Sequence, residues 1–215
     1  MSSWIIRSLA AIGAALTLTG CEEATGFPFA EMGDLGTESE HARTLKIAMG
    51  NGDIVLSAPD GYCIDRRSVR RVGDKGFAMI ARCDTVGVRG YYEGYDLAVM
   101  TVTTARQAPG SPAPTLKDMS SIAQGARVLD KASRDGVVLV RLGTGSAALD
   151  GVSPVHWRGA FQLNDNLVGV SVYGPEGSGA VGRNGAALIS DLAQRTRTAS
   201  KRESLPKTAE SGKTD

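Results

Sequence analysis

Three pairs of short stretches with alternating apolar and polar residues constrain the fold of this chain most strongly. The pairs occupy residues 44–57, 127–143 and 156–174, and their centres read GNG, DG and NDN. Glycine, asparagine and aspartate tolerate the positive φ that tight hairpin turns require. The pattern therefore predicts three antiparallel β-hairpins.

Two further strands and two helices are predicted between and after these hairpins. The strands cover residues 77–83 and 96–103, and a proline-rich loop then leads to a helix that Thr115 can cap, with Asp118 in the capping-box position. A last helix is expected from Asn184 to about Thr198. Adjacent strands pair antiparallel in such an order, so we expect one α+β domain over residues 44–198, an antiparallel sheet of hairpins covered by the two helices.

Residues 1–20 read as a secretion signal. Their apolar core, 9–18, carries no charge and is too short to span a bilayer, which takes about 20 residues in a helix. The run closes on Leu18-Thr19-Gly20-Cys21, which resembles the lipobox of bacterial lipoproteins. That resemblance implies cleavage before Cys21, lipid attachment to its sulfur and amine, and a membrane anchor. The alternatives are an ordinary cleaved signal, for which Leu18-Thr19-Gly20 is a poor site, or an N-terminal anchor.

The same resemblance bears on location. It places the protein in the cell envelope, facing the periplasm. Inner-membrane lipoproteins often carry aspartate after the acylated cysteine, whereas this chain has Glu22. The resemblance therefore favours the periplasmic leaflet of the outer membrane.

The two ends of the predicted mature chain are polar. Residues 21–43 hold the lipidated cysteine and six acidic side chains without helical or alternating periodicity, which predicts an acidic flexible tether. Residues 199–215 are also polar, and we expect a disordered tail there.

Charge limits the partners. The signal segment carries one arginine and no acid, so 23 of the 24 basic side chains remain against 23 acidic ones. A chain near neutrality lacks the basic excess that nucleic-acid binding requires. No later apolar run reaches membrane-spanning length, so the membrane is expected as a partner only through the lipid.

The two remaining cysteines, Cys63 and Cys83, are expected to form a disulfide, since disulfides persist in exported proteins. The alternatives are two free thiols or half of a metal site. A metal site needs two further ligands, and neither His41 nor His156 stands in ligand spacing with a cysteine. We therefore expect no metal.

A basic segment follows the first cysteine. Residues 65–75 read DRRSVRRVGDK, with five basic side chains and two aspartates. A solvated loop or short helix with local ion pairs is the expectation, and an anion-binding patch is the alternative.

A glycine- and tyrosine-rich loop supplies the candidate recognition surface. It places Arg89, Tyr91, Tyr92 and Tyr95 close together, and tyrosines offer amphipathic contact area at low entropic cost. The alternative is a hairpin tip whose tyrosines fold back onto the sheet.

Catalysis has one weak candidate, His156, as the base of an envelope hydrolase. No Gly-x-Ser-x-Gly motif accompanies it, although Ser146, Ser153 and Asp150 lie nearby in sequence. Residues 177–182 match G-x-G-x-x-G, but the strand before them belongs to a hairpin and no acidic residue follows at the expected spacing. No cofactor is expected.

The order of elements, with the turn Pro59-Asp60-Gly61-Tyr62 after an early strand, is similar to the PsbP-like and DcrB-like α+β sandwich of bacterial envelope lipoproteins. The similarity is one of topology and transfers no functional residue. The sequence thus predicts a lipid-anchored binding or structural module whose partner is another envelope protein or a small ligand, with an envelope hydrolase as the alternative.

Overall fold

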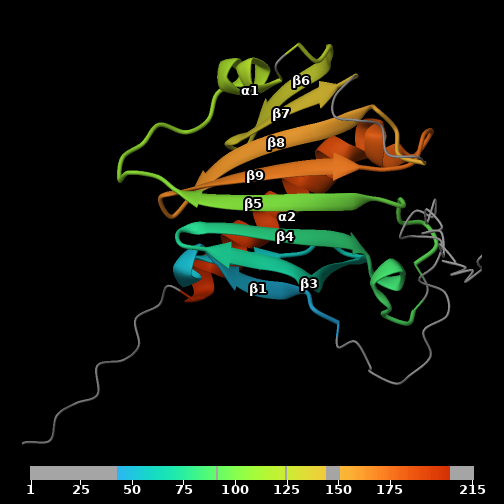
Figure 1. The fold of residues 1–215 in the computed structure, drawn as a ribbon, viewed down its shortest axis with the longest axis horizontal. Helices are drawn as coiled ribbons and strands as arrows, with labels where there is room; N and C mark the ends of the chain where they lie inside the picture. The colour runs from blue at the N-terminus through green and yellow to red at the C-terminus, as the bar shows by residue number, and fades with distance from the viewer. Residues whose placement is uncertain (1–42, 91, 124, 144–150, 204–215) are drawn as a thin grey trace, which may run out of the picture.

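The computed structural model describes residues 43–90, 92–123, 125–143 and 151–203, which form one α+β domain (Figure 1). Its main element is an antiparallel sheet with the strand order β3-β4-β5-β9-β8-β7-β6. The strands of this sheet are β3 Tyr62–Val72, β4 Lys75–Arg82, β5 Val99–Arg106, β6 Val128–Arg134, β7 Val137–Leu142, β8 His156–Leu163 and β9 Asn166–Tyr173. The helices are α1 Leu116–Ile122 and α2 Arg183–Glu203, and short 3-10 turns occur at η1 Gly50–Gly52, η2 Cys83–Val86 and η3 Gly179–Val181.

All three predicted hairpins are present. β6 pairs with β7 and β8 with β9, and the turns between them place Asp135, Asn164 and Asp165 at positive φ. The first hairpin, β1 Lys46–Met49 with β2 Ile54–Ser57, does not join the others. It forms a separate two-stranded sheet, and the short 3-10 turn η1 takes the place of the tight turn expected at Gly50–Gly52.

One face of the seven-stranded sheet, here called the inner face, carries the main core. Alternate residues of the strands meet α2 on this face, where Ile189, Leu192 and Ala193 are fully buried. The β1–β2 hairpin packs beside α2, with Ile54 and Leu56 in the same core. Figure 1 shows α2 running behind the sheet across several strands.

On the opposite, outer face the described helix α1 covers the end of the sheet formed by β6, β7 and β8. α1 packs on β7 through Met119, and the buried side chains beneath it are Val138, Val140 and Ala160. Across the middle of this face Met79, Thr101 and Ser171 lie side by side in register and are half-buried. No described helix crosses these strands in Figure 1.

Two sequence-based boundaries were wrong. The basic segment 65–75 is neither loop nor helix, since it continues strand β3 and turns into β4. The last helix runs to Glu203, so residues 199–203 belong to the domain and not to the tail, with Ala199 and Ser200 buried. Residues 204–215 lie outside the described part of the chain.

Two glycines on neighbouring strands test this layering. A Cβ on Gly159 would lie 2.8 Å from Ile189 of α2, whereas one on Gly169 would meet only the Thr103 hydroxyl on the outer face. We expect Gly159→Ala to lower the free energy of unfolding by about 1–3 kcal/mol through overpacking. Gly169→Ala is the matched control. It should lower the free energy of unfolding clearly less, because the exposed Thr103 side chain can rotate away. Equal losses in urea denaturation would contradict the assignment of the two faces.

Candidate functional site

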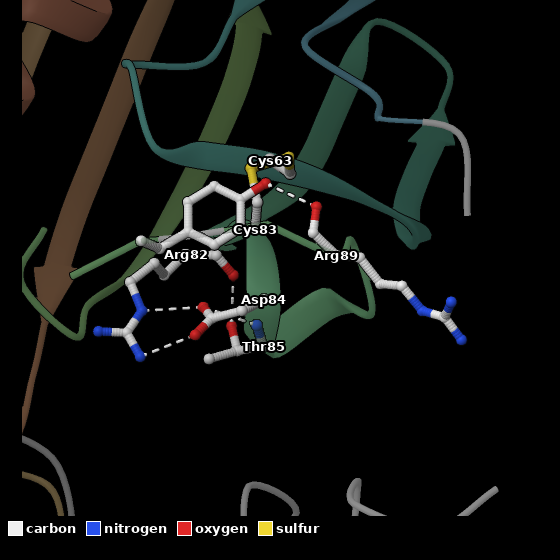
Figure 2. Close-up of a disulfide and its surroundings, with 7 residues drawn as sticks. Cys63, Arg82, Cys83, Asp84, Thr85 and Arg89 are labelled. Carbon is white, nitrogen blue, oxygen red and sulfur yellow. Dashed lines mark hydrogen bonds and ion pairs between the residues drawn. A yellow bond between two sulfur atoms is a disulfide. The ribbon is translucent and has the colours of Figure 1, made fainter. Parts of the chain in front are cut away.

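The candidate site is the loop between β4 and β5, which begins at a disulfide. Cys63 on β3 and Cys83 directly after β4 are joined, with Cα atoms 4.8 Å apart and both side chains buried (Figure 2). The predicted cross-link is thus confirmed. A bridge across a separation of 20 residues contributes about 3 kcal/mol in the chain-entropy model.

A small cluster forms around the two sulfurs. Tyr92 is 9% exposed and packs with both cysteines, and Val86 and Val88 cover them in part. The Tyr92 hydroxyl lies 3.5 Å from the carbonyl of Arg89. Tyr92 therefore folds back into the domain, as the alternative interpretation of the tyrosines proposed, and supports the loop from within.

The start of the loop is fixed by an arginine and an aspartate. Arg82 donates from Nε and Nη2 to the two carboxylate oxygens of Asp84, at 2.8 and 2.9 Å (Figure 2). It also donates from Nη1 to the carbonyl of Tyr95. The hydrogen bonds to Asp84 raise the pKa of Arg82. The Thr85 hydroxyl donates to the Arg82 carbonyl at 2.7 Å. These contacts hold η2 against the end of β4.

The end of the loop is fixed from α2 and β3. The buried Tyr62 hydroxyl donates to the backbone carbonyl of Asp96 at 2.8 Å, and burial raises the pKa of this tyrosine. Asn184, in the first turn of α2, donates to the Asp96 carboxylate at 2.8 Å. The loop is thus clamped at both ends by the folded domain.

The exposed side chains of the loop include Arg89, Tyr95 and Leu97, and we call these three residues the loop surface. Tyr95 is 41% and Leu97 39% exposed, and Arg89 is also exposed. The Tyr95 ring lies on Gly61, where a Cβ would come within 2.5 Å of it, and meets Tyr62 edge to face. Tyr91 lies outside the described residues. Of the four residues predicted, Arg89 and Tyr95 are exposed on this loop. Leu97 was missed because a lone apolar residue gives no signal in the sequence.

His156 is the first residue of β8 and lies in the sheet. It is 1% exposed, its Nδ1 is 3.2 Å from the carbonyl of Pro154, and its ring stacks on Tyr173. Within the described residues Nε2 has no hydrogen-bond partner, and Ser153 instead accepts from the backbone of Val155. Ser146 and Asp150 lie outside the described residues. The described geometry assembles no catalytic triad around His156.

The glycine-rich segment 177–182 is used by the domain itself. It follows β9, an antiparallel strand, and forms η3 with Ser178 as its cap. The Trp157 indole donates to the carbonyl of Gly182 and Arg141 to that of Val181. Its role in this structure is to join β9 to α2.

The described residues contain neither a cluster of metal ligands nor a membrane-spanning helix. No three His, Cys, Asp or Glu side chains among them gather in a way that could hold a metal ion. None of their helices combines the length and apolar character needed to cross a membrane.

The fold and site define an α+β domain with a disulfide-braced surface loop. No family model matches this chain, and no curated protein matches it. Among solved structures it is similar to a mutant of the protein Mog1, with 15% identity over 74% of this chain and 88% of that one, at a TM-score of 0.36. The Saccharomyces cerevisiae Ran-binding protein Mog1p gives 14% identity, the same coverage and a TM-score of 0.37. Likeness this weak assigns neither a detailed fold nor a role.

The buried histidine predicts a pH dependence of stability. Burial lowers the pKa of His156 in the folded state, and the Arg158 charge adds to this. Below the unfolded-state pKa of about 6.5 the unfolded chain binds more protons, so the free energy of unfolding should fall as the pH drops from about 7.5 to about 5.5. His156→Leu should flatten this dependence in thermal unfolding. If the stability of His156→Leu still changed with pH as steeply as that of the parent, His156 would not be the source of the pH dependence.

Proposed function

We propose that this protein is an envelope lipoprotein, cleaved before Cys21 and held to the membrane by acyl chains on that residue. Two observations support the proposal. The segment Leu18 to Cys21 resembles a lipobox, and the other two cysteines are cross-linked in the fold. A disulfide is typical of a chain that folds outside the reducing cytoplasm. Glu22 favours the periplasmic leaflet of the outer membrane within this proposal.

Within this role we propose that the domain is a binding module and that the loop surface contacts its partner, another envelope protein or a small ligand. The main observation in support of this binding role is that the loop is fixed to the domain at Cys83 and at Asp96, while Tyr95 and Leu97 stay exposed to solvent. A loop whose two ends are already fixed loses less entropy on binding. Tyrosine and arginine are also the residue types enriched at binding hot spots.

We further propose that the fold is a PsbP-like or DcrB-like sandwich. The order of elements supports this, as does the turn before β3, where the Tyr62 amide donates to the Pro59 carbonyl at 3.1 Å. The seven-stranded antiparallel sheet with one long helix across its inner face is the coarser architecture on which this proposal builds.

Acylation is tested by metabolic labelling. Wild-type protein should incorporate labelled palmitate and fractionate with membranes, because several acyl chains on one cysteine give a lasting anchor. Cys21→Ser should take up no label and should accumulate as an uncleaved precursor. Label that persists in Cys21→Ser, or normal maturation of that variant, would overturn the proposal.

Partner contact is tested by site-specific photo-crosslinking in cells. A photoreactive side chain at Tyr95 should crosslink to one partner, because this position is exposed on the clamped loop. The adduct would be one with a second protein if the partner is an envelope protein, or one with a small molecule if it is a ligand. The same side chain at Lys131, exposed on β6, is the control and should not give that adduct. Identical adducts from both positions would contradict a role for the loop surface.

A further inference from the structure

Basic side chains gather along β3, the edge strand of the large sheet, and we call this group the basic edge. All of its members are exposed. They are Arg66, Arg67, Arg70 and Arg71 of β3, Lys75 at the start of β4, and Arg43 and Lys46 on the segment that runs beside β3. That segment is placed by the Ile64 amide, which donates to the Thr44 carbonyl at 2.8 Å, and by Arg71, which donates to the carbonyl of Ala48.

A wide bulge gives the basic edge its shape. Asp65 pairs with Met79 and Arg70 with Phe77, so residues 66–69 lie outside the regular ladder. The bulge is held internally, since the Ser68 hydroxyl donates to the Asp65 carbonyl at 2.6 Å and accepts from the Met79 amide at 2.8 Å. Bulges at sheet edges re-aim side chains. Arg66 and Arg67 are therefore exposed on a bulge whose backbone is fixed through Ser68.

The basic edge is poorly neutralised by the domain. Its one carboxylate contact in the described residues is Arg67 with Asp65, at 3.6 Å. Arg70 instead donates to the carbonyls of Arg67 and Val69. Elsewhere arginines are closely paired, as Arg195 is with Asp60 at 2.6 Å. Seven basic groups face only two aspartates here, Asp65 and Asp74, in a chain whose total formal charge is +1.

The position of the basic edge relative to the N-terminal segment suggests its ligand. Thr44 is hydrogen-bonded to Ile64 at the start of β3, so the residues before it leave the domain at the Cys63 end of the β3–β4 hairpin. The link from Cys21 to Arg43 spans 22 residues and reaches at most about 75 Å. If Cys21 is acylated, the basic edge lies within reach of the lipid headgroups.

We propose that the basic edge binds the phosphate groups of anionic phospholipids in the bilayer that holds the acylated Cys21. This inference rests on the proposed function. Arginine can donate two parallel N–H hydrogen bonds to the oxygens of one phosphate. In addition, each basic residue close to an anionic membrane adds its own electrostatic attraction. The turn of the β3–β4 hairpin then faces the membrane, and the loop surface, at the opposite end of that hairpin, stays free for a partner (Figure 1).

The acidic residues between Cys21 and Arg43 oppose this contact. Six carboxylates in that segment are repelled by an anionic bilayer and are attracted to the arginines. Any valid test must therefore keep the segment in place. Lysine and arginine on edge strands also protect against edge-to-edge pairing, a role that needs no ligand.

The experiment uses the full chain in lipid nanodiscs with a fluorophore on Val72→Cys. Val72 is 75% exposed among the basic residues, so headgroup-linked quenchers should report its approach to the membrane. Quenching should be stronger in discs of phosphatidylcholine mixed with phosphatidylglycerol than in phosphatidylcholine alone. It should decline as ionic strength rises from about 0.1 M to about 1 M, since the Debye length shortens from about 10 Å to about 3 Å.

A matched pair of triple variants separates the basic edge from net charge. Arg66→Gln/Arg67→Gln/Lys75→Gln should weaken docking by about fivefold for each charge removed. Lys117→Gln/Lys131→Gln/Arg134→Gln removes the same charge from exposed positions on α1 and β6 and should leave the quenching intact. Equal loss in both triples would overturn the proposal. Equal quenching of the parent in both kinds of disc would also overturn it, and would leave edge protection as the role of the arginines.

The mass of the protein in the same discs shows whether Cys21 is acylated. This separates the headgroup proposal from the lipoprotein proposal on which it rests. If the chain is acylated but its quenching does not depend on the lipid, only the proposal that the basic edge binds headgroups would be contradicted. An unacylated chain that still shows quenching specific to phosphatidylglycerol would contradict the lipoprotein assignment and keep the headgroup contact.

Discussion

The bond between Cys63 and Cys83 is the constraint on which the candidate site depends. It ties the start of β3 to the residue that follows β4, and the loop leaves the sheet at that point. The cluster around the sulfurs adds only Tyr92 as a further buried side chain. So small a cluster buries little apolar surface, and the covalent link supplies much of the order that a larger core would otherwise provide.

The core sets where binding can occur. α2 and the β1–β2 hairpin seal the inner face of the sheet, and their contacts hold the largest hydrophobic cluster. What remains accessible is the middle of the outer face, the braced loop at one end of the β3–β4 hairpin, and the arginine-rich edge strand. A partner surface and a membrane-facing surface at opposite ends of one hairpin would suit a tethered module, because each can be occupied without blocking the other.

Sequence patterns predicted the parts of the fold that local chemistry determines. Asp135 and Asn164 take the turn conformations for which they were expected, and Thr115 and Asp118 form a complete capping box. β3 was not predicted, because an exposed edge strand has no need of alternating apolar residues. The end of α2 was missed for a different reason. Thr196 and Ser200 look like solvent-facing residues, yet their hydroxyls accept from the Ser57 and Val55 amides of β2.

The site was predictable only in part. Spacing and compartment pointed to the disulfide, and composition pointed to the tyrosine loop. Nothing local distinguishes Tyr92, which is buried against the sulfurs, from the exposed Tyr95. The contact of Asn184 with Asp96 joins residues 88 positions apart, which a single sequence cannot reveal.

The account depends most directly on the oxidation state of two cysteines in the native protein. Thiols would be trapped in intact cells with an alkylating agent before lysis, and non-reduced peptides would be mapped by mass spectrometry. The account predicts a linked pair of peptides containing Cys63 and Cys83, with no alkylation at either. Two alkylated cysteines in the folded, native protein would contradict the brace, and with it the inference that this domain works in an oxidising compartment.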